Sequence, residues 1–287
     1  MTGIFAILNT SDRYMELSIK QKELLIKFHE LLVYGDSKLR ATELNYKKLR
    51  TKKQVLYFMM GATQSYAESI LRLVQPPSIY DKAAEVLMRS IIETLINLDY
   101  VYASRTQQNA LSFMIYSTKD QIDFAKRHKK FMKKYPSWNL EFGYIKNPED
   151  WDEFLRNKEK EIKLGERYFK KSFSDKFPNI RKRAETADNY LESKGKLTEG
   201  KSLEKYYVLY YKYFSQVAHL TMPGLERFTS YDENNHLRFD LDGKPDDIDR
   251  VVSVTYIIYF AILRFFLKEF KIFNKVEFEQ FSKKIDK

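Results

Sequence analysis

A chain of 287 residues is long enough to bury a large core, and 44% hydrophobic with 31% charged residues excludes a disordered protein. The net charge is +11, and the stretch from Lys119 to Arg183 holds 19 Lys and Arg against 11 Asp and Glu. This basic stretch has two interpretations, attraction to a polyanion or an ordinary solvated surface. The chain has no cysteine, which excludes disulfides, thiolate metal sites and a Cys nucleophile and fits the reducing cytoplasm.

The sequence predicts neither a signal peptide nor a membrane-spanning helix. The N-terminal residues have no basic n-region and no cleavage site, so no signal peptide is expected. The longest apolar run, Val251–Leu263, falls short of the roughly 20 residues that a bilayer requires. It is therefore expected to be a buried helix.

Scarce glycine (9) and proline (7) leave room for long helices. Apolar residues at 3–4 spacing and capping signals predict roughly eight helices and almost no sheet. In chain order the predicted helices are Ser11 or Asp12 to Tyr34, Asp36 or Ser37 to Val74 with a break near Thr51, Asp81–Arg105, Gln108–Lys134, Asn147–Leu164, Asn179–Leu191, Leu203–His219, Ile248–Phe273 and Val276–Ile285.

Two glycines and one polar stretch refine this outline. Gly35 is placed as the residue that ends the first helix, and mid-helix Gly61 predicts close approach of another helix. The stretch Arg227–Lys244 loses the helical period and carries turn signals, which predicts a small hairpin.

The expected fold class is all-α: a multi-helix bundle with a long basic helical insertion and at most one small β-hairpin. Residues 1–118 and 203–287 would form the core bundle, and residues 119–202 the charged insertion. A single compact domain is the other interpretation.

Two predicted helices carry the residues of the candidate site. Polar residues recur every four positions along the apolar Asp81–Arg105 segment, and a second stripe recurs along Leu203–His219. The first stripe is Glu85, Arg89, Glu93 and Asn97, and the second is Tyr207, Tyr211, Ser215 and His219. The first stripe is either the solvated face of an amphipathic helix or a buried network, and the apolar residues around it favour burial.

If the two stripes meet, they could bind or cleave a phosphodiester. Arg89 would bind phosphate, His219 would act as general base or acid, and Glu93 would orient either one. Asn97, Ser215 and Tyr211 would support them by hydrogen bonds. These groups suffice for metal-independent RNA cleavage by the 2′-OH, but equally for phosphate binding alone; His219 could also simply suit a helix C-terminus.

Other chemistries lack their motifs. The sequence contains no Gly-x-Ser-x-Gly elbow, no His-Glu-x-x-His, no Walker loop and no Gly-x-Gly-x-x-Gly. A serine hydrolase, a metal site and a classical nucleotide fold are not expected, and no metal or other cofactor is predicted.

The basic helix Gln108–Lys134 is the candidate nucleic-acid-binding surface. Its cations cluster in the last three turns: Lys126, Arg127, Lys129, Lys130, Lys133 and Lys134. A solvated face is the alternative. Attachment of Lys119–Lys134 to a membrane surface is less favoured, because Phe124, Phe131 and Met132 give it only a modest apolar face.

The two spacings resemble a family of bacterial helical proteins in which an Arg-Ser-x-x-Glu-x-x-x-Asn helix precedes a Ser-x-x-x-His helix. The resemblance covers Ala83–Tyr102 and Tyr206–Leu220. More distantly, the chain is similar to the HEPN superfamily, whose signature places a His four to six residues after an Arg; no His follows Arg89 at that distance. The resemblance implies an all-α fold, a homodimer and a bacterial antiphage-defence or toxin context.

The predicted function is therefore an RNA-engaging, HEPN-like defence or toxin protein of the cytoplasm, with endoribonuclease activity if it is an enzyme. RNA, a second copy of the chain and a protein partner are the expected partners, and no membrane is. The alternative function is a non-catalytic helical sensor or scaffold in which Arg89, Glu93 and His219 form a buried polar network.

Overall fold

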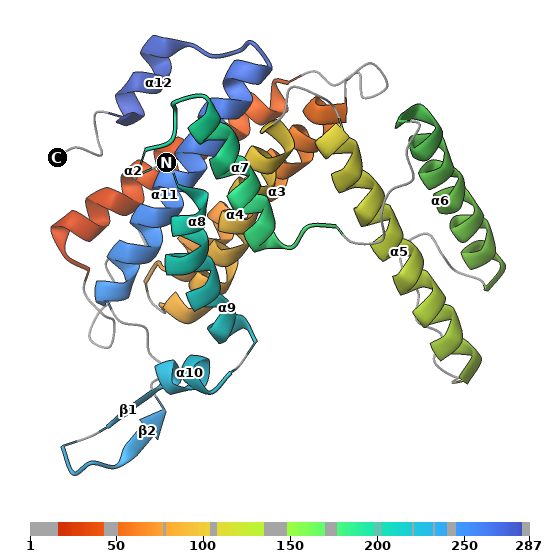
Figure 1. The fold of residues 1–287 in the computed structure, drawn as a ribbon. Coiled ribbons are helices and arrows are strands. Elements are labelled where there is room, and N and C mark those ends of the chain that lie inside the picture. Colours follow the sequence, from red (N-terminus) through yellow and green to blue (C-terminus); the bar gives the residue numbers. More distant parts are fainter. Residues whose placement is uncertain are drawn as a thin grey trace. The chain divides into compact units, whose positions relative to one another are not determined.

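A computed structural model describes residues 17–42, 51–76, 79–103, 108–134, 148–169, 177–198, 200, 202–219, 221–231, 233–239 and 245–282. These residues form helices joined by short connections, with one two-stranded sheet (Figure 1). The all-α fold class is thus confirmed. The chain divides into a larger unit, Met1–Tyr100 with Ile180–Lys287, and a smaller unit, Val101–Asn179.

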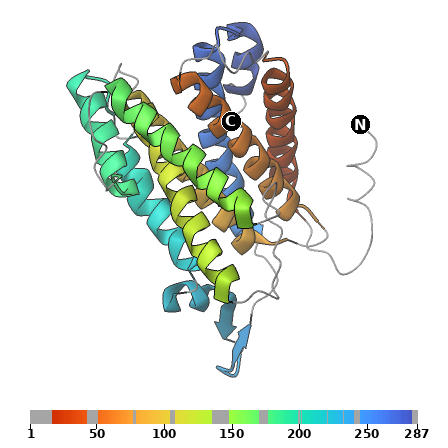
Figure 2. The same cartoon turned by 90° about the vertical axis from the view of Figure 1, so that its right-hand side faces the viewer.

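The larger unit is built around α11 (Pro245–Glu269), which packs against α2 (Ile19–Arg40) and α3 (Thr51–Leu73). Figures 1 and 2 show these three helices side by side in perpendicular views. Their interior is apolar and aromatic, with Phe28, Met60 and Tyr259 fully buried. Burial of such side chains is the main stabilising contribution in a helical bundle.

Among the described helices, one segment, Asp247–Glu269 of α11, has the length and composition of a membrane span. More than half of its most apolar window is buried inside the bundle, which is how the core helix of a soluble protein behaves. Val251, Tyr259 and Leu263 are all fully enclosed. The prediction that Val251–Leu263 is a buried helix is confirmed.

Helix α2 begins at Ile19, after a capping box. Ser18 Oγ accepts a hydrogen bond from the Gln21 N–H at 3.2 Å, and Gln21 Oε1 accepts one from the Ser18 N–H at 3.0 Å. This reciprocal pair satisfies two backbone donors at the helix start. The predicted caps, Ser11 and Asp12, lie outside the described residues.

Gly35 lies inside α2, so the predictions of a helix end at Gly35 and a restart at Asp36 or Ser37 are wrong. A Cβ at Gly35 would lie 1.8 Å from Tyr259 Oη and 3.0 Å from Tyr259 Cζ, so the glycine allows α2 to approach α11 closely. The prediction of a close approach at Gly61 is wrong, because a Cβ there would meet nothing within 4 Å.

The helix predicted at Leu203–His219 is present, but its middle is wound more widely. α8 (Leu203–Tyr206) continues as the π-helical segment η3 (Tyr207–Tyr211) and then as α9 (Lys212–Ala218). His219 follows as the C-cap. Short π-helical turns are uncommon and occur often at functional sites.

Two further helices flank this segment. α4 (Asp81–Tyr102) carries the first polar stripe, and its predicted end, Arg105, lies outside the described residues. α7 (Ile180–Ser193) holds the start of α8 through Asp188, whose carboxylate accepts from the N–H groups of Leu203 and Glu204 at 2.9 and 3.0 Å. An acid at a helix N-terminus satisfies N–H groups that have no partner in the helix.

The predicted hairpin forms within Arg227–Lys244. α10 (Met222–Leu225) and the 3₁₀ turn η4 (Glu226–Phe228) lead into β1 (Thr229–Tyr231), which pairs antiparallel with β2 (Leu237–Phe239). The hairpin projects from one end of the larger unit's helices (Figures 1 and 2).

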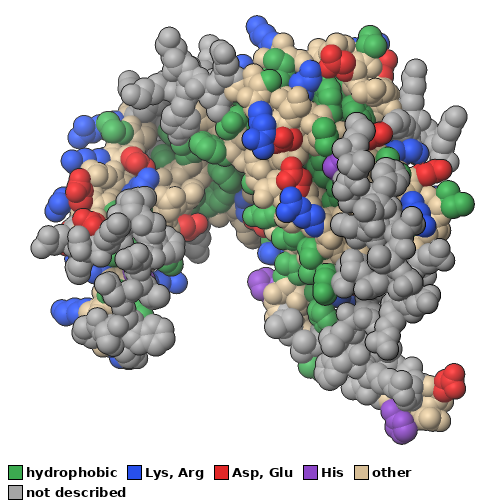
Figure 3. Space-filling model, turned by 180° about the vertical axis from the view of Figure 1, so that it is seen from behind, with side chains coloured by type: hydrophobic (Ala, Val, Ile, Leu, Met, Phe, Trp, Pro, Cys, Tyr) green, Lys and Arg blue, Asp and Glu red, His purple; other side chains and the backbone are tan. Residues whose placement is uncertain are grey.

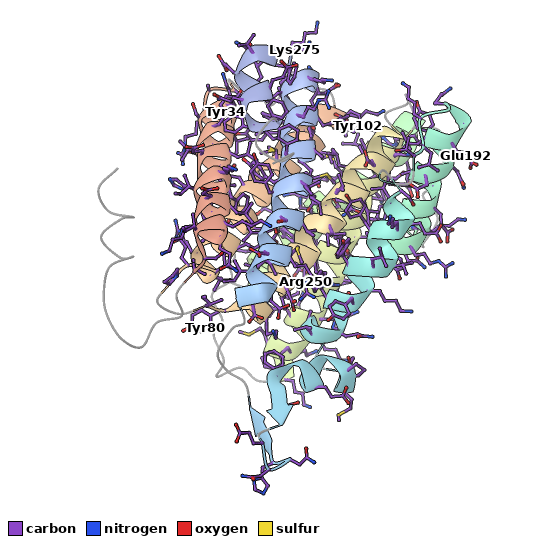
Figure 4. All side chains as sticks on the ribbon, turned by 90° about the vertical axis from the view of Figure 1, so that its left-hand side faces the viewer. Tyr34, Tyr80, Tyr102, Glu192, Arg250 and Lys275 are labelled. Atoms are coloured by element: carbon purple, nitrogen blue, oxygen red, sulfur yellow. The ribbon has the colours of Figure 1, made fainter. Side chains whose placement is uncertain are left out.

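The last helix, α12 (Lys275–Ser282), docks near the C-terminal half of α2. Glu277 accepts a hydrogen bond from the Tyr34 hydroxyl at 3.3 Å and pairs with Lys38 at 2.9 Å. The ring of Phe281 lies 5.2 Å from that of Tyr34. Tyr34 and Lys275 are labelled at the same end of the bundle in Figure 4.

The smaller unit contains two antiparallel helices, α5 (Gln108–Lys134) and α6 (Pro148–Phe169). Gly165 lets them approach closely, since a Cβ there would lie 2.5 Å from Ile115 Cδ1. Near the other end, Ala125 and Trp151 are buried together. Both ends of α5 match the prediction. α6 begins at Pro148, directly after the predicted start Asn147, and continues past the predicted end, Leu164, to Phe169.

The unit boundaries differ from those predicted for the insertion, residues 119–202. α5 pairs with α6 as a whole, including the part before residue 119, so the smaller unit starts earlier. α7 packs against α8 and belongs to the larger unit, so the smaller unit also ends earlier, at Asn179.

Candidate functional site

The polar stripe of α4 is not a solvated face. Glu85 is fully buried, Asn97 is 8% exposed, and Arg89 and Glu93 are half-buried. Each contacts a polar side chain of another helical segment. We call the set the polar seam: Glu85, Arg89, Glu93, Asn97, Arg183, Tyr211, Ser215 and Arg250. Of the two interpretations of the stripe, the structure agrees with burial.

Arg89 lies at the centre of the polar seam. Its Nε donates to Ser215 Oγ at 2.7 Å, and its Nη2 donates to the Tyr211 hydroxyl at 2.9 Å. The guanidinium carbon lies 4.8 Å from the centroid of the Tyr211 ring. Ser215 Oγ in turn donates to the Tyr211 carbonyl at 2.7 Å. The second stripe thus meets the first through Tyr211 and Ser215.

The partners of Arg89 are hydroxyls, which carry no charge. In the described part of the chain no carboxylate forms an ion pair with Arg89, and no group accepts from its Nη1. Glu93 reaches Arg89 only through Tyr211, whose hydroxyl donates to Glu93 Oε2 at 3.3 Å. The positive charge of Arg89 is therefore fixed in place but not neutralised by a direct partner.

Tyr211 keeps its proton under ordinary conditions. Burial raises the pKa of Tyr211, and the nearby Glu93 carboxylate adds to the rise. Its ring stacks on that of Tyr207 at 5.4 Å, across one turn of the π-helical segment. A protonated Tyr211 can donate to Glu93 and accept from Arg89 at the same time.

The second arginine of the polar seam, Arg183 of α7, was missed by sequence reasoning. It donates to Asn97 Oδ1 and lies 4.0 Å from Glu93 Oε1. Burial lowers the pKa of Arg183 from its usual high value. The signal that could have found it is its place before the small residues Ala184 and Ala187, which mark the buried face of α7.

At its other end the polar seam joins α11. Glu85 accepts from Arg250 Nη2 at 2.7 Å, and the same guanidinium pairs with Asp247 at 2.7 Å. Asp247 also pairs with Lys82 at 3.1 Å. Burial raises the pKa of Asp247, but the two cations Lys82 and Arg250 outweigh burial and lower this pKa below its usual value. Figure 4 shows Arg250 at the same end of the bundle as Tyr80, which directly precedes α4. This end is a structural clamp between α4 and α11.

His219 does not join the polar seam. Its side chain is exposed, and its backbone N–H donates to the Ser215 carbonyl at 3.0 Å. No hydrogen bond links its ring to Arg89 or Glu93 among the described residues. It lies one turn beyond Ser215 at the end of α9, so a ligand on Arg89 would have to extend toward it.

The six predicted nucleic-acid-binding cations lie on α5, and all six are exposed. Lys129 pairs with Asp152 of α6 at 2.6 Å, and Lys126 lies 4.0 Å from Glu159. On the face of the molecule drawn in Figure 3, Lys and Arg side chains alternate with Asp and Glu rather than forming one continuous field. Among the cations of α5, Lys126 and Lys129 thus lie beside carboxylates of α6.

Metal-ligand chemistry has no support in the part of the chain that the structure describes. These residues contain no group of three or more His, Cys, Asp or Glu side chains that could hold a metal ion. Around Arg89 the polar seam offers one guanidinium, the hydroxyls of Tyr211 and Ser215 and the carboxylate of Glu93, which can bind an oxyanion and organise its hydrogen bonds.

Comparison with known proteins gives one match. The profile of a family of unknown function, DUF5677, matches residues 53–237, and this range includes α4, α7 and α9. No curated protein and no solved structure shows significant similarity to the chain.

Proposed function

The chain belongs to DUF5677, a family of unknown function, and from its own residues we propose that it is an RNA-engaging bacterial defence or toxin protein that cleaves RNA without a metal. The site would be the Arg89 cluster, meaning Arg89, Glu93, Tyr211 and Ser215, with His219 beside it.

One observation carries the proposal. Arg89 is hydrogen-bonded to two hydroxyl groups and lies over the face of a tyrosine ring, yet its charge has no carboxylate partner in the described residues. A half-buried guanidinium in this state favours binding of an anion, and its fork geometry suits a phosphate. An arginine placed only for stability would be expected to contact a carboxylate, as Arg250 does with Glu85.

The proposed reaction uses the 2′-OH of RNA as nucleophile. A phosphodiester bound to Arg89 would be attacked by the neighbouring 2′-oxygen, and the bond to the 5′-oxygen would break. His219, one turn from Ser215, would accept the 2′-OH proton while water protonates the leaving 5′-oxygen, or would protonate the 5′-oxygen while water accepts the 2′-OH proton. The products are a 2′,3′-cyclic phosphate and a 5′-OH end. Glu93 would keep Tyr211 and thereby Arg89 in position.

The test is cleavage of RNA in the presence of EDTA. Wild type, Arg89→Gln and His219→Asn would be incubated with transfer RNA and with total RNA, and the product ends would be identified. Arg264→Gln and His236→Asn are matched controls, because both positions are exposed and neither belongs to the Arg89 cluster. We expect wild type and both controls to produce cyclic-phosphate ends, and both site variants to lose at least about 100-fold in rate.

Two results would refute the enzymatic proposal. One is the absence of cleavage by folded wild-type protein at any RNA tested. The other is cleavage that survives in both site variants, since it would have to come from another site or from a contaminating nuclease.

A second function is favoured by a different observation. Every member of the α4 stripe contacts a side chain from another helical segment, which is what a purely structural network requires. In this scaffold or sensor function, Arg89→Gln would lower thermal stability and leave no RNA phenotype. The resemblance that motivates the defence context also predicts a homodimer in the cytoplasm, and sedimentation velocity of the purified chain tests the dimer.

A further inference from the structure

The side of α5 that faces away from α6, called here the outward face, carries both aromatic and basic side chains. Phe124 and Phe131 are 46% and 38% exposed although α5 is packed along α6. Arg127, Lys130 and Lys134 are exposed as well. At 3.6 residues per turn, these five residues fall on one side of the helix, over its last three turns.

The opposite side of α5 is already occupied. Ile122 and Ala125 are buried, and Ala125 packs with Trp151 of α6. Lys129 is paired with Asp152 of α6. Residues of this side therefore stabilise the helix pair. On the other side Phe124 and Phe131 stay partly exposed, with the Phe124 ring stacked on that of His128 at 6.0 Å.

Two cations of the outward face, Arg127 and Lys130, differ from Lys129 in their partners. Arg127 and Lys130 form no ion pair with any residue that the structure describes. Acidic residues on this face, Asp120 and Asp123, precede Phe124, so a favourable surface for an anion starts at about Phe124 and continues to the end of α5.

We infer that this face, Phe124, Arg127, Lys130, Phe131 and Lys134, binds single-stranded RNA, with bases stacked on the phenylalanines and phosphates beside the cations. The choice of RNA rests on the proposed function, which the inference deepens by naming the strandedness of the substrate. Aromatic side chains stack on unpaired bases whatever their sequence, and a row of cations follows the backbone. A base-paired duplex cannot offer its base faces to the two rings.

An anionic membrane surface is the competing occupant. Interfacial helices keep their apolar and charged residues on opposite sides, so that the apolar side can enter the lipid. On α5 the exposed phenylalanines and cations share one side, while the apolar side faces α6. This arrangement favours a polymer that presents stacking faces and phosphates together.

The experiment measures binding of fluorescent oligouridine and oligoadenosine of 20 nucleotides, of a 20-base-pair RNA duplex and of vesicles containing phosphatidylserine. The intact chain would be compared with Phe124→Leu, Phe131→Leu and Arg127→Gln. Phe58→Leu is the control for an exposed phenylalanine, and Arg264→Gln is the control for an exposed cation outside α5.

We expect each phenylalanine variant to weaken binding of single strands roughly tenfold, with its thermal stability unchanged. Arg127→Gln should reduce the salt dependence by about 0.7 in the slope of log K against log salt, the value for one phosphate of a single strand. Both controls should stay within about twofold of wild type. The duplex should bind less tightly than either single strand.

Three results would overturn the inference: equal binding of duplex and single strand, phenylalanine variants with wild-type affinity, or vesicle binding that depends on Phe124 and Phe131 without RNA binding. Failure of the proposed function is seen separately. Arg89→Gln should abolish cleavage, and the losses of affinity caused by Phe124→Leu and Phe131→Leu should persist in the Arg89→Gln background, so binding that depends on phenylalanine can stand even where no wild-type cleavage is found.

Discussion

Replacement of Gly35 by alanine tests the packing of α2 on α11. The alanine Cβ would lie 1.8 Å from Tyr259 Oη and 3.1 Å from Gln64 Oε1, well inside contact distance. Tyr259 is fully buried and its hydroxyl is hydrogen-bonded to Gln64 Oε1. The clash can only be relieved if Tyr259 moves and this hydrogen bond is lost or distorted.

The magnitude follows from three contributions. Overpacking of a core costs about 1–3 kcal/mol. Loss of a buried hydrogen bond costs about 1–3 kcal/mol. Alanine in a helix interior is favoured over glycine by about 1 kcal/mol. We therefore expect Gly35→Ala to lower the free energy of unfolding by about 3 kcal/mol, and the Tm by roughly 6–12 °C for a chain of this size.

Gly61→Ala is the matched control, because Gly61 also lies inside a helix but a Cβ there would meet nothing within 4 Å. It should stabilise the protein by about 0.5–1 kcal/mol. The assay is chemical unfolding followed by circular dichroism, supported by thermal scans. Tyr259→Phe combined with Gly35→Ala should recover part of the loss, since it removes the nearest atom. If Gly35→Ala proved as harmless as Gly61→Ala, the close approach of α2 and α11 would be disproved.

Three further perturbations address stability and the polar seam. Burial raises the pKa of Asp99 to about 7, with Asp188 adding to the rise. Between about pH 4 and 7 Asp99 is therefore protonated in the folded protein and ionised in the unfolded chain. The free energy of unfolding falls as pH rises through that window, because the unfolded chain releases the proton that the folded protein holds. Asp99→Asn should remove the fall and stabilise the protein at pH 8, by at most about 4 kcal/mol, with little effect at pH 4; equal gains at both pH values would contradict this. Arg183→Met should cost about 2–3 kcal/mol in urea unfolding by leaving the Asn97 carbonyl without its donor, and Asn97→Leu should cost less in that background than in wild type. Ser18→Ala should cost about 1 kcal/mol by removing the cap of α2, and an unchanged urea midpoint would show that the cap is not formed.

Helix ranges followed from the sequence wherever local signals decided them. The end of α5, two residues before Pro136 in the sequence, and the start of α6 at Pro148 both follow from a proline at or near the boundary. The prediction that a helix ends at Gly35 was wrong for the opposite reason. Its role depends on Tyr259, a residue more than two hundred positions later, and nothing beside Gly35 in the chain distinguishes a helix end from a helix contact.

The same distinction between local signals and distant contacts applies to the residues of the candidate site. The four-residue spacing was sufficient to put Glu85, Arg89, Glu93 and Asn97 in one stripe, because a helix fixes which residues share a face. It could not supply the partners, since these depend on how other helices pack against α4. Arg183 stayed hidden because its side chain looks like part of a solvated basic run, Arg181 to Arg183, until α7 is placed beside α4.

The uncompensated charge of Arg89 links stability to binding. A half-buried guanidinium with no carboxylate partner in the described residues is stabilised further when an anion binds it, and a ligand that binds only the folded state raises the free energy of unfolding. Short single-stranded RNA at 100 times its dissociation constant should add about 2.7 kcal/mol, seen as a rise in Tm. Binding to α5 contributes to that rise, so the informative quantity is the difference between Arg89→Gln and the exposed control Arg264→Gln. A smaller rise in Arg89→Gln alone would show that the polar seam itself binds the phosphate. Equal rises in both variants would mean that Arg89 serves only to join α4 to α9.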